Sequence, residues 1–229
     1  MIKEAIILAG GLGTRLRSVI ADLPKCMAPV NGKPFLHYVL TNLQKEGITR
    51  FIFSLGYKSE SIAEYVNQLS TANVELSIEQ EPLGTGGGIK LASKKVKNKN
   101  AIVVNGDTLY KIDVNALSTL QNNEYADCTL CLKPMNNFDR YGAVELNTDG
   151  SISTFKEKQF YSSGLINGGV YALNIEQFNK EDLPAKFSFE NDYLEKLVGK
   201  RKFYGIVQDE YFIDIGIPED YERAQRELK

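Results

Sequence analysis

Short apolar runs alternate with amphipathic stretches along the first half of the chain. Continuous apolar runs are typical of strands buried on both faces of a sheet, whereas apolar residues at helical spacing predict amphipathic helices. The predicted strands are 5–8, 51–53, 74–78 and 101–105. The predicted helices are 34–46, 59–69 and 87–96. Strands that alternate with helices in this way indicate βαβ units and a parallel sheet.

The pattern changes after Tyr125, where the chain becomes rich in strands. Strand-like segments follow in CTLCL, YGAVELNTDGSISTF and GGVYALN, and the NTDG sequence at 147–150 predicts a hairpin turn. Helices are predicted again at about 190–197 and 218–228. We therefore expect a Rossmann-like nucleotide-binding half, followed by an acceptor-binding half with antiparallel strands on the same sheet.

A glycine-rich turn directly follows the first predicted strand. Gly10, Gly11 and Gly13 allow the backbone to approach a phosphate closely, and their N–H groups can bind anions. Arg15 and Lys25 come soon afterwards and add positive charge. The third glycine of the dinucleotide fingerprint is missing, because Leu16 stands in its place, and no complete P-loop occurs. The turn therefore predicts a phosphate site and disfavours a dehydrogenase.

Two aspartates each follow an apolar strand and are candidates for a metal site. Asp107 comes at the carboxyl end of the run 101–105, where ligands bind in open α/β sheets, and Asp214 lies within the apolar segment YFIDIG. A single aspartate of this kind is more often a helix cap or an ion-pair partner. Two together favour Mg²⁺, which commonly takes one or two carboxylates, substrate phosphates and water.

Composition narrows the class of protein further. The formal net charge is -2, which argues against a general nucleic-acid or membrane-surface binder. No apolar run approaches the roughly 20 residues of a membrane span, and the N-terminus does not resemble a signal peptide, so we expect a cytoplasmic protein.

Cys128 and Cys131 are predicted to point to opposite faces of a strand as core residues, and His37 is predicted to be a surface or edge residue.

Several motifs in combination resemble one family, the sugar-1-phosphate nucleotidyltransferases. The motifs appear in the family's order and cover essentially the whole chain: LAGGLGTRL, PK at 24–25, PVNGKP, EPLGTGG, NGD, EK at 157–158, NGGVY and FIDIGIPEDY. The resemblance implies an α/β fold, a Rossmann-like three-layer α/β/α arrangement with a mixed, mainly parallel central sheet. It implies a single domain over 1–229, with a nucleotide-binding half at about 1–115, a sugar-phosphate-binding half at about 116–229 and no C-terminal β-helix domain.

The resemblance also implies roles for individual residues. The catalytic residues would be Arg15, Lys25, Asp107 and Asp214, with both aspartates holding Mg²⁺. The nucleoside triphosphate would contact Leu8, Ala9, Gly10, Gly11, Gly13, Thr14, Glu81, Pro82, Gly84 and Thr85. The sugar phosphate would contact Tyr141, Gly142, Glu157, Lys158, Asn167 and Gly168. Relatives often have proline or another small residue where this chain has Cys26, which we expect to be tolerated and oxidation-sensitive.

Overall similarity within the family favours GTP as donor and a heptose 1-phosphate as acceptor, in a pathway to bacterial surface polysaccharide. No single residue selects guanine or heptose, so two alternative substrate pairs stay open: UTP, dTTP or CTP with a hexose or amino-sugar 1-phosphate, and GTP with mannose 1-phosphate. The oligomeric state also stays open and includes a homo-oligomer. A non-catalytic nucleotide-sugar sensor is the alternative of a different class, although Arg15, Lys25 and both aspartates are present. A glycosyltransferase is disfavoured because the chain has no Asp-x-Asp motif.

Overall fold

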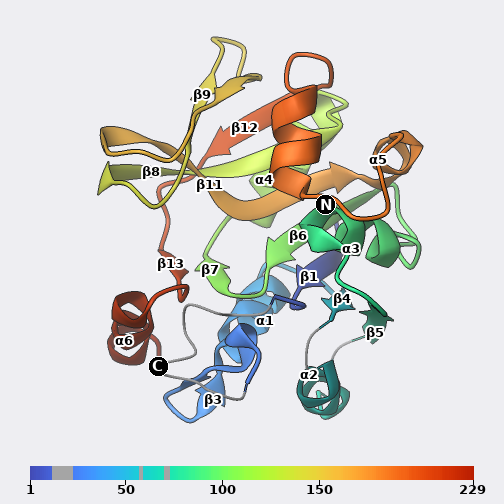
Figure 1. The fold of residues 1–229 in the computed structure, drawn as a ribbon, viewed down its shortest axis with the longest axis vertical. Coiled ribbons are helices and arrows are strands. Elements are labelled where there is room, and N and C mark those ends of the chain that lie inside the picture. The colour runs from blue at the N-terminus through green and yellow to red at the C-terminus, as the bar shows by residue number, and fades with distance from the viewer. Residues whose placement is uncertain (12–22, 57–58, 70–72) are drawn as a thin grey trace.

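A nine-stranded sheet forms the centre of the molecule. The computed structural model describes residues 1–11, 23–56, 59–69 and 73–229. The strands of the sheet are β1 (Glu4–Leu8), β4 (Arg50–Leu55), β5 (Asn73–Ile78), β6 (Asn100–Asn105), β8 (Cys128–Phe138), β9 (Ala143–Leu146), β10 (Ile152–Phe155), β11 (Tyr161–Asn174) and β12 (Phe203–Val207). Their order is β10-β9-β11-β6-β1-β4-β5, and β8 pairs with both β11 and β12 (Figure 1).

The sheet is mixed, as the sequence predicts. Strands β5, β4, β1 and β6 are parallel neighbours and come from the βαβ half of the chain. Strand β11 continues the sheet beyond β6 and runs antiparallel to β6, β8 and β9. The predicted antiparallel strands of the second half therefore extend the same sheet.

Strand β11 changes neighbours halfway along its length. Its residues 170–174 pair with β6, whereas Leu165 and Ile166 pair with β9. Between these two parts the register with β8 shifts, and Gly169 adopts a φ of +70°, a left-handed conformation that favours glycine. The strand is irregular at this point, and one edge of β11 pairs with β9 along its first part and with β6 along its second part.

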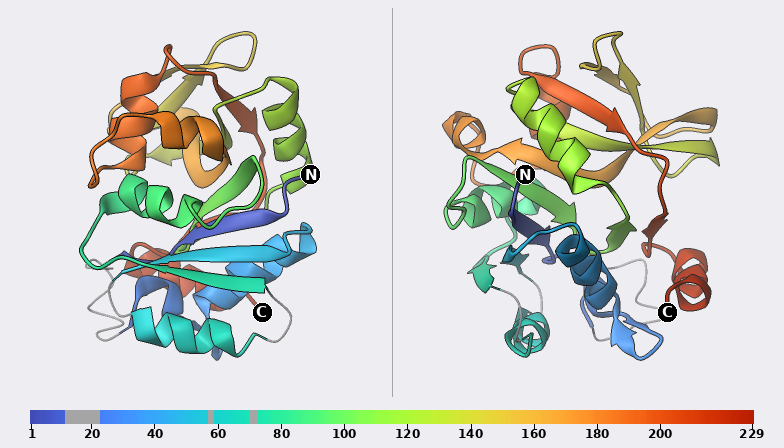
Figure 2. Two further views of the ribbon diagram at one scale, coloured as in Figure 1. Left: turned by 90° about the vertical axis from the view of Figure 1, so that its right-hand side faces the viewer. Right: turned by 180° about the vertical axis from the view of Figure 1, so that it is seen from behind.

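Helices cover both faces of the sheet. They are α1 (Phe35–Lys45), α2 (Ser59–Asn67), α3 (Gly84–Ser93), α4 (Val114–Asn123), α5 (Ile175–Lys180), α6 (Pro218–Glu227) and a π-helix at Phe189–Glu195. In β1, Ile7 belongs to the apolar cluster that includes α1, α2, α4 and α6, while the adjacent Ile6 belongs to the cluster with α3, α5 and the π-helix. Successive strand residues point to opposite faces, so this division shows three layers, α/β/α (Figure 2).

The structure confirms the predicted helices of the first half, with shifts at some of their ends, and adds two helices that were not predicted. Helix α1 matches its prediction, and Gly47 just beyond it has a φ of +83°. Helix α2 ends two residues earlier than predicted, and α3 begins and ends three residues earlier. Helices α4 and α5 were missed, although Asp113 and Asn174 cap them by accepting hydrogen bonds from Ala116 N and Gln177 N.

The C-terminal helix packs beside the chain's first half (Figure 1). Two short strands, β2 (Pro29–Val30) and β3 (Lys33–Pro34), form a hairpin that contacts α6. Asn31 Nδ2 donates to Gln225 O at 2.8 Å, and Tyr221 Oη donates to Pro29 O at 2.5 Å. These contacts tie the segment that follows Lys25 to the C-terminal end of the chain.

The cysteine and histidine predictions agree with the packing. Cys131 and Cys128 are buried in the two different apolar clusters, on opposite faces of β8, and both are free thiols. His37 lies partly buried in α1, 3.4 Å from the hydroxyl of Tyr65. No helix in the described ranges is both long and apolar enough to cross a lipid bilayer.

Candidate active site

A small strand pair brings the two predicted metal-binding aspartates together. Strand β7 (Thr108–Tyr110) directly follows Asp107 and pairs antiparallel with β13 (Phe212–Asp214), so that Asp214 lies opposite Thr108. The amide of Ile215 donates to the carbonyl of Asp107 at 3.1 Å. Two carboxylates far apart in the sequence therefore lie side by side at the carboxyl end of β6.

Lys25 bridges these two carboxylates. It begins a short 3₁₀ turn (Lys25–Met27), and its Nζ lies 2.5 Å from Asp107 Oδ2 and 3.3 Å from Asp214 Oδ1. Burial, the largest single influence, lowers the pKa of Lys25, but the two carboxylates together outweigh burial and leave that pKa raised. The site therefore holds a permanent positive charge between two negative ones at neutral pH.

Asp214 is oriented by three further neighbours. Its Oδ1 accepts from the amide of Gly216 at 2.8 Å, and its Oδ2 lies 3.4 Å from Tyr141 Oη and 3.7 Å from Arg140 Nη2. Arg140 also pairs with Asp220 in the first turn of α6. Because several groups hold this carboxylate, its direction is set before any ligand arrives.

A first cavity of about 560 Å³ extends from the aspartates to the glycine-rich turn. Of the residues predicted to bind the nucleotide or the metal, those lining it are Leu8, Ala9, Gly10, Gly11, Lys25, Pro82, Gly84, Thr85, Asp107 and Asp214. Gly13, Thr14 and Arg15 lie outside the described residues. Glu81 is exposed and is not part of the lining. Two residues that the sequence analysis missed, Ser54 and Glu79, line the cavity from the ends of β4 and β5.

A second glycine-rich loop, EPLGTGG at 81–87, has a packing role as well as a place at this cavity. The amides of Gly86 and Gly87 donate to Phe187 O, and a Cβ on Gly86 would lie 2.1 Å from the Phe187 ring. Glycine is thus required where α3 meets the segment before the π-helix. Pro82, Gly84, which has a φ of +73°, and Thr85 are the residues of this loop that line the cavity.

A second cavity of about 540 Å³ lies in the strand-rich half. All six residues predicted to bind the sugar phosphate line it: Tyr141, Gly142, Glu157, Lys158, Asn167 and Gly168. The irregular middle of β11 forms one wall, where Asn167 Nδ2 donates to Tyr171 Oη at 2.9 Å and Asn167 Oδ1 accepts from Gly169 N at 3.0 Å. The sequence analysis missed Glu190, Asn191 and Glu195, which the π-helix places on another wall.

The two cavities meet at the aspartates. Asn105, Thr108 and Asp214 line both, and Lys25 lines the first cavity beside them. Ligands bound in the two cavities would therefore approach each other at a point that carries one ammonium and two carboxylates.

The donor set at this point fits a divalent cation that is shared with a ligand. Asp107 and Asp214 converge closely enough to contact a single ammonium nitrogen. Within the described ranges, no group of three or more His, Cys, Asp or Glu side chains could hold a metal by itself. A hard cation on the two carboxylates would therefore complete its shell with phosphate oxygens and water, as expected for oxygen ligands.

Cys26 lies beside this site but is chemically protected. Burial, assisted by the negative charge of Asp107, raises the pKa of its thiol to about 12. The thiolate is the form that oxidants attack, so the expectation that Cys26 is oxidation-sensitive is not supported by its surroundings.

Comparisons with known proteins agree with this geometry. The family described as Nucleotidyl transferase matches residues 4–229. A D-glycero-alpha-D-manno-heptose 1-phosphate guanylyltransferase of Aneurinibacillus thermoaerophilus is 52% identical over 99% of this chain and 98% of its own. The enzyme of the same name from Campylobacter jejuni is 50% identical over 95% of this chain and 96% of its own. The crystal structure of HddC from Yersinia pseudotuberculosis complexed with GMP-PN is 38% identical over the full length of both chains, with a TM-score of 0.88.

Proposed function

Because the chain belongs to the nucleotidyl transferase family, we propose that it transfers the guanylyl group of GTP to D-glycero-α-D-manno-heptose 1-phosphate. The products are GDP-heptose and pyrophosphate, and the nucleotide sugar would serve the synthesis of bacterial surface polysaccharide. The observation that carries this proposal is the meeting of two cavities at Asp214, next to Lys25. The names of the guanylyltransferase relatives support the choice of donor and acceptor.

The reaction requires two polyanions to approach each other. A phosphate oxygen of the sugar 1-phosphate forms a bond to the α-phosphorus of GTP, while the bond from that phosphorus to the departing pyrophosphate breaks. The sugar phosphate is already ionised at neutral pH, so no general base is needed. Positioning and charge neutralisation are the main contributions that the protein makes to such a step.

Each charged residue at the junction has a distinct part in this mechanism. Lys25 neutralises charge between donor and acceptor, because its ammonium lies where the two cavities meet. Asp107 and Asp214 would hold Mg²⁺, which would neutralise phosphate charge and orient the reacting groups. Arg15, outside the described residues, is assigned to the leaving pyrophosphate.

The first cavity, which we call the nucleotide cavity because predicted nucleotide-binding residues line it, presents the carboxylate of Glu79, and this group supports the choice of guanine. Guanine presents two adjacent donors, N1–H and the N2 amino group, which a carboxylate can accept together. Uracil and thymine present one N–H between two carbonyl oxygens, which a carboxylate would repel. Glu79 Oε2 already accepts from Leu83 N at 3.0 Å, and its Oε1 accepts from Ser54 Oγ at 3.4 Å, so the direction of the group is fixed.

The second cavity, which we call the acceptor cavity, suits a polyhydroxylated sugar phosphate. Glu157, Glu190 and Asn167 bring carboxylate and amide oxygens to it, which accept hydrogen bonds from hydroxyl groups. Lys158 brings positive charge for the phosphate, and Lys156, which pairs with Glu145, lies beside it in the lining. This mixture of acceptors and cations matches a ligand with many hydroxyls and one phosphate.

The direct test is pyrophosphate release from each of GTP, ATP, UTP, CTP and dTTP, paired with heptose, mannose, glucose and N-acetylglucosamine 1-phosphates. We expect the highest kcat/KM for GTP with the heptose 1-phosphate. Higher activity with UTP or dTTP would contradict the donor, and higher activity with mannose 1-phosphate would contradict the acceptor. No release with any pair, from a protein that still binds GTP, would favour the non-catalytic sensor.

A further inference from the structure

A third cavity, rich in basic residues, lies at the other end of the sheet from the candidate active site. Its volume is about 630 Å³. We call it the basic cavity, after the cationic residues that line it, which are Lys99, Lys180, Lys200, Arg201 and Lys202. Lys99 directly precedes β6, whose opposite end reaches the active site at Asn105. Six residues of strand correspond to roughly 20 Å, so a ligand here would not touch the reacting groups.

The positive charge of the basic cavity is only partly compensated. Glu181 is occupied by Arg201, whose Nε and Nη2 donate to its two oxygens at 2.5 and 3.1 Å. The other carboxylate in the lining, Asp127, accepts from the backbone amide of Lys202 at 3.0 Å. Among the described residues, no ion pair includes the side chain of Lys99, Lys200 or Lys202. Three free ammonium groups on a chain of net charge -2 are a local attraction for an anion.

Tyr125 also lines the basic cavity, and its backbone has a left-handed conformation that is unfavourable for a tyrosine. Tyr125 follows the end of α4 with a φ of +48°, and the amide of Ala126 donates to Gln121 O at 3.1 Å, as in a helix cap that favours glycine at this position. The Tyr125 side chain is nevertheless 74% exposed. Neither backbone conformation nor packing accounts for a tyrosine here, whereas a ring exposed beside three lysines can stack on a ligand.

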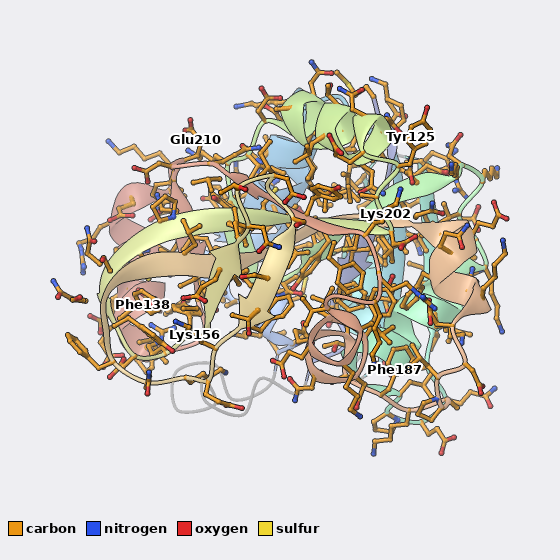
Figure 3. All side chains as sticks on the ribbon, turned by 90° about the horizontal axis from the view of Figure 1, so that it is seen from above. Tyr125, Phe138, Lys156, Phe187, Lys202 and Glu210 are labelled. Atoms are coloured by element: carbon orange, nitrogen blue, oxygen red, sulfur yellow. The ribbon has the colours of Figure 1, made fainter. Side chains whose placement is uncertain are left out.

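We propose that the basic cavity is a second, non-catalytic site for a nucleoside diphosphate group. The lysines would contact the phosphates, and the ring of Tyr125 would stack on the base. The shared chemistry is a diphosphate joined to an aromatic base, and it could come from a free nucleotide or from a nucleotide sugar. Figure 3 shows Tyr125 and Lys202 in one part of the molecule, apart from Lys156 at the acceptor cavity.

Residue-resolved NMR titrations of the full chain separate this site from the active site. GDP, GDP-mannose, guanosine and pyrophosphate would each be added to the ¹⁵N-labelled protein. We expect GDP and GDP-mannose to shift the amides of Asp127, Lys200 and Lys202, with an affinity independent of that reported by Gly10 and Asp107. A stronger effect of GDP-mannose would identify the nucleotide sugar as the source, and a stronger effect of GDP would identify the free nucleotide.

Three variants test the assignment of the binding groups. Lys200→Ala/Lys202→Ala should weaken binding at the basic cavity by about tenfold while leaving the Gly10 response unchanged. Lys94→Ala/Lys97→Ala removes the same charge elsewhere on the surface and should leave both responses unchanged. Tyr125→Gly should raise Tm, because glycine relieves the left-handed backbone, and yet weaken nucleotide binding by about tenfold.

The proposal is overturned if GDP shifts only active-site amides, or if both lysine pairs have equal effects. It is also overturned if pyrophosphate binds as tightly as GDP and Tyr125→Gly changes neither affinity. The pyrophosphate-release assay is independent of these shifts, so failure of the proposed reaction would be recognised separately.

Discussion

At the scale of single residues, Lys25 has a structural role and a proposed chemical role. Its ammonium contacts both Asp107 and Asp214, and without it the two carboxylates would repel each other at close range. The same charge lies at the junction of the two cavities, where phosphates of both substrates are expected. Removing it should therefore affect turnover far more than folding.

Lys25→Ala should lower kcat for pyrophosphate release by about 10²–10³, the usual effect of removing one preorganised group that stabilises developing charge. Lys33→Ala, which removes an exposed lysine outside both cavities, is the matched control and should retain full activity. A kcat for Lys25→Ala within a few fold of the wild type, with an unchanged Tm, would show that the assigned role is wrong.

Glu79→Gln tests how the nucleobase is read. A neutral amide accepts through one oxygen and presents a donor in place of the second, so it no longer matches the two donors of guanine. We expect kcat/KM for GTP to fall by about tenfold or more, and the ratio of UTP to GTP activity to rise. Glu81→Gln is the control, because the exposed Glu81 does not line the nucleotide cavity. An equal loss with GTP and UTP would assign Glu79 a purely structural role at the start of α3.

At the scale of elements, the position of α3 depends on a tertiary contact. Its first-turn amides at Gly86 and Gly87 donate to Phe187 O, about a hundred positions later in the chain, and its glycines leave room for the Phe187 ring. This contact explains why α3 begins three residues before its predicted start. It also places Gly84 and Thr85 at the nucleotide cavity.

Gly86→Ala should destabilise the protein by about 1–3 kcal/mol, because the added methyl would overlap the Phe187 ring. Chemical denaturation measures the change in the free energy of unfolding. Phe187→Ala should be destabilising by itself, but adding Gly86→Ala to it should cause little further loss. Equal losses from Gly86→Ala in both backgrounds would show that the contact with Phe187 is not the cause.

The amino ends of the parallel strands are held by a buried ion pair. Arg50 in β4, which is 6% exposed, pairs with Glu4 in β1 and Glu75 in β5, and it donates to Lys95 O at 2.9 Å. Glu4 is 2% exposed and also accepts from the amide of Asn98 at 2.7 Å. One charged cluster thus joins three strands and the segment after α3.

Arg50→Met should destabilise the protein by about 3–5 kcal/mol, because it leaves the Glu4 carboxylate buried without its cation. Glu75→Gln disturbs only the more exposed arm of the same cluster and should change the free energy of unfolding by less than about 1 kcal/mol. Urea denaturation of the two variants compares these values directly. A similar small effect for both would contradict a stabilising role for the buried pair of Arg50 and Glu4.

At the scale of the whole molecule, the sheet places two substrate cavities at one edge. The nucleotide cavity is built around the ends of the parallel strands, and the acceptor cavity is built around the irregular part of β11 and the segments beside it. They share Asp214, which reaches the junction only because β13 pairs with β7. The junction of the two cavities therefore depends on the pairing of β13, near the C-terminus, with β7, which directly follows Asp107.

Removal of divalent cations should abolish turnover. Without a cation, two carboxylates and two polyanionic substrates would come together, and Lys25 would be the main positive charge in the described part of the site to offset their repulsion. We expect EDTA to stop pyrophosphate release and added Mg²⁺ to restore it. Asp107→Asn should raise the Mg²⁺ concentration needed for half-maximal activity, whereas Asp209→Asn, at an exposed ion pair, should not. Full activity in EDTA would contradict a metal at these aspartates.

The sequence by itself determined the βαβ half of the fold and most of the site's chemistry. The continuous apolar runs predicted β1, β4 and β6, because strands covered on both faces need apolar residues at every position. The motifs and their order predicted site roles for Lys25, Asp107, Asp214 and the six acceptor-cavity residues. In the structure these residues line the two adjoining cavities. The predictions for Gly13, Thr14 and Arg15 stay predictions, since they lie outside the described residues.

Only the tertiary structure decided where α3 begins. It also decided that Glu79, and not Glu81, lines the nucleotide cavity, and that the π-helix supplies Glu190 and Glu195 to the acceptor cavity. It also revealed the basic cavity, whose residues come from four separate segments of the chain. Local patterns report which side chains must be buried and which backbone positions need glycine. They carry no information about partners from distant segments, and such partners set these features of the molecule.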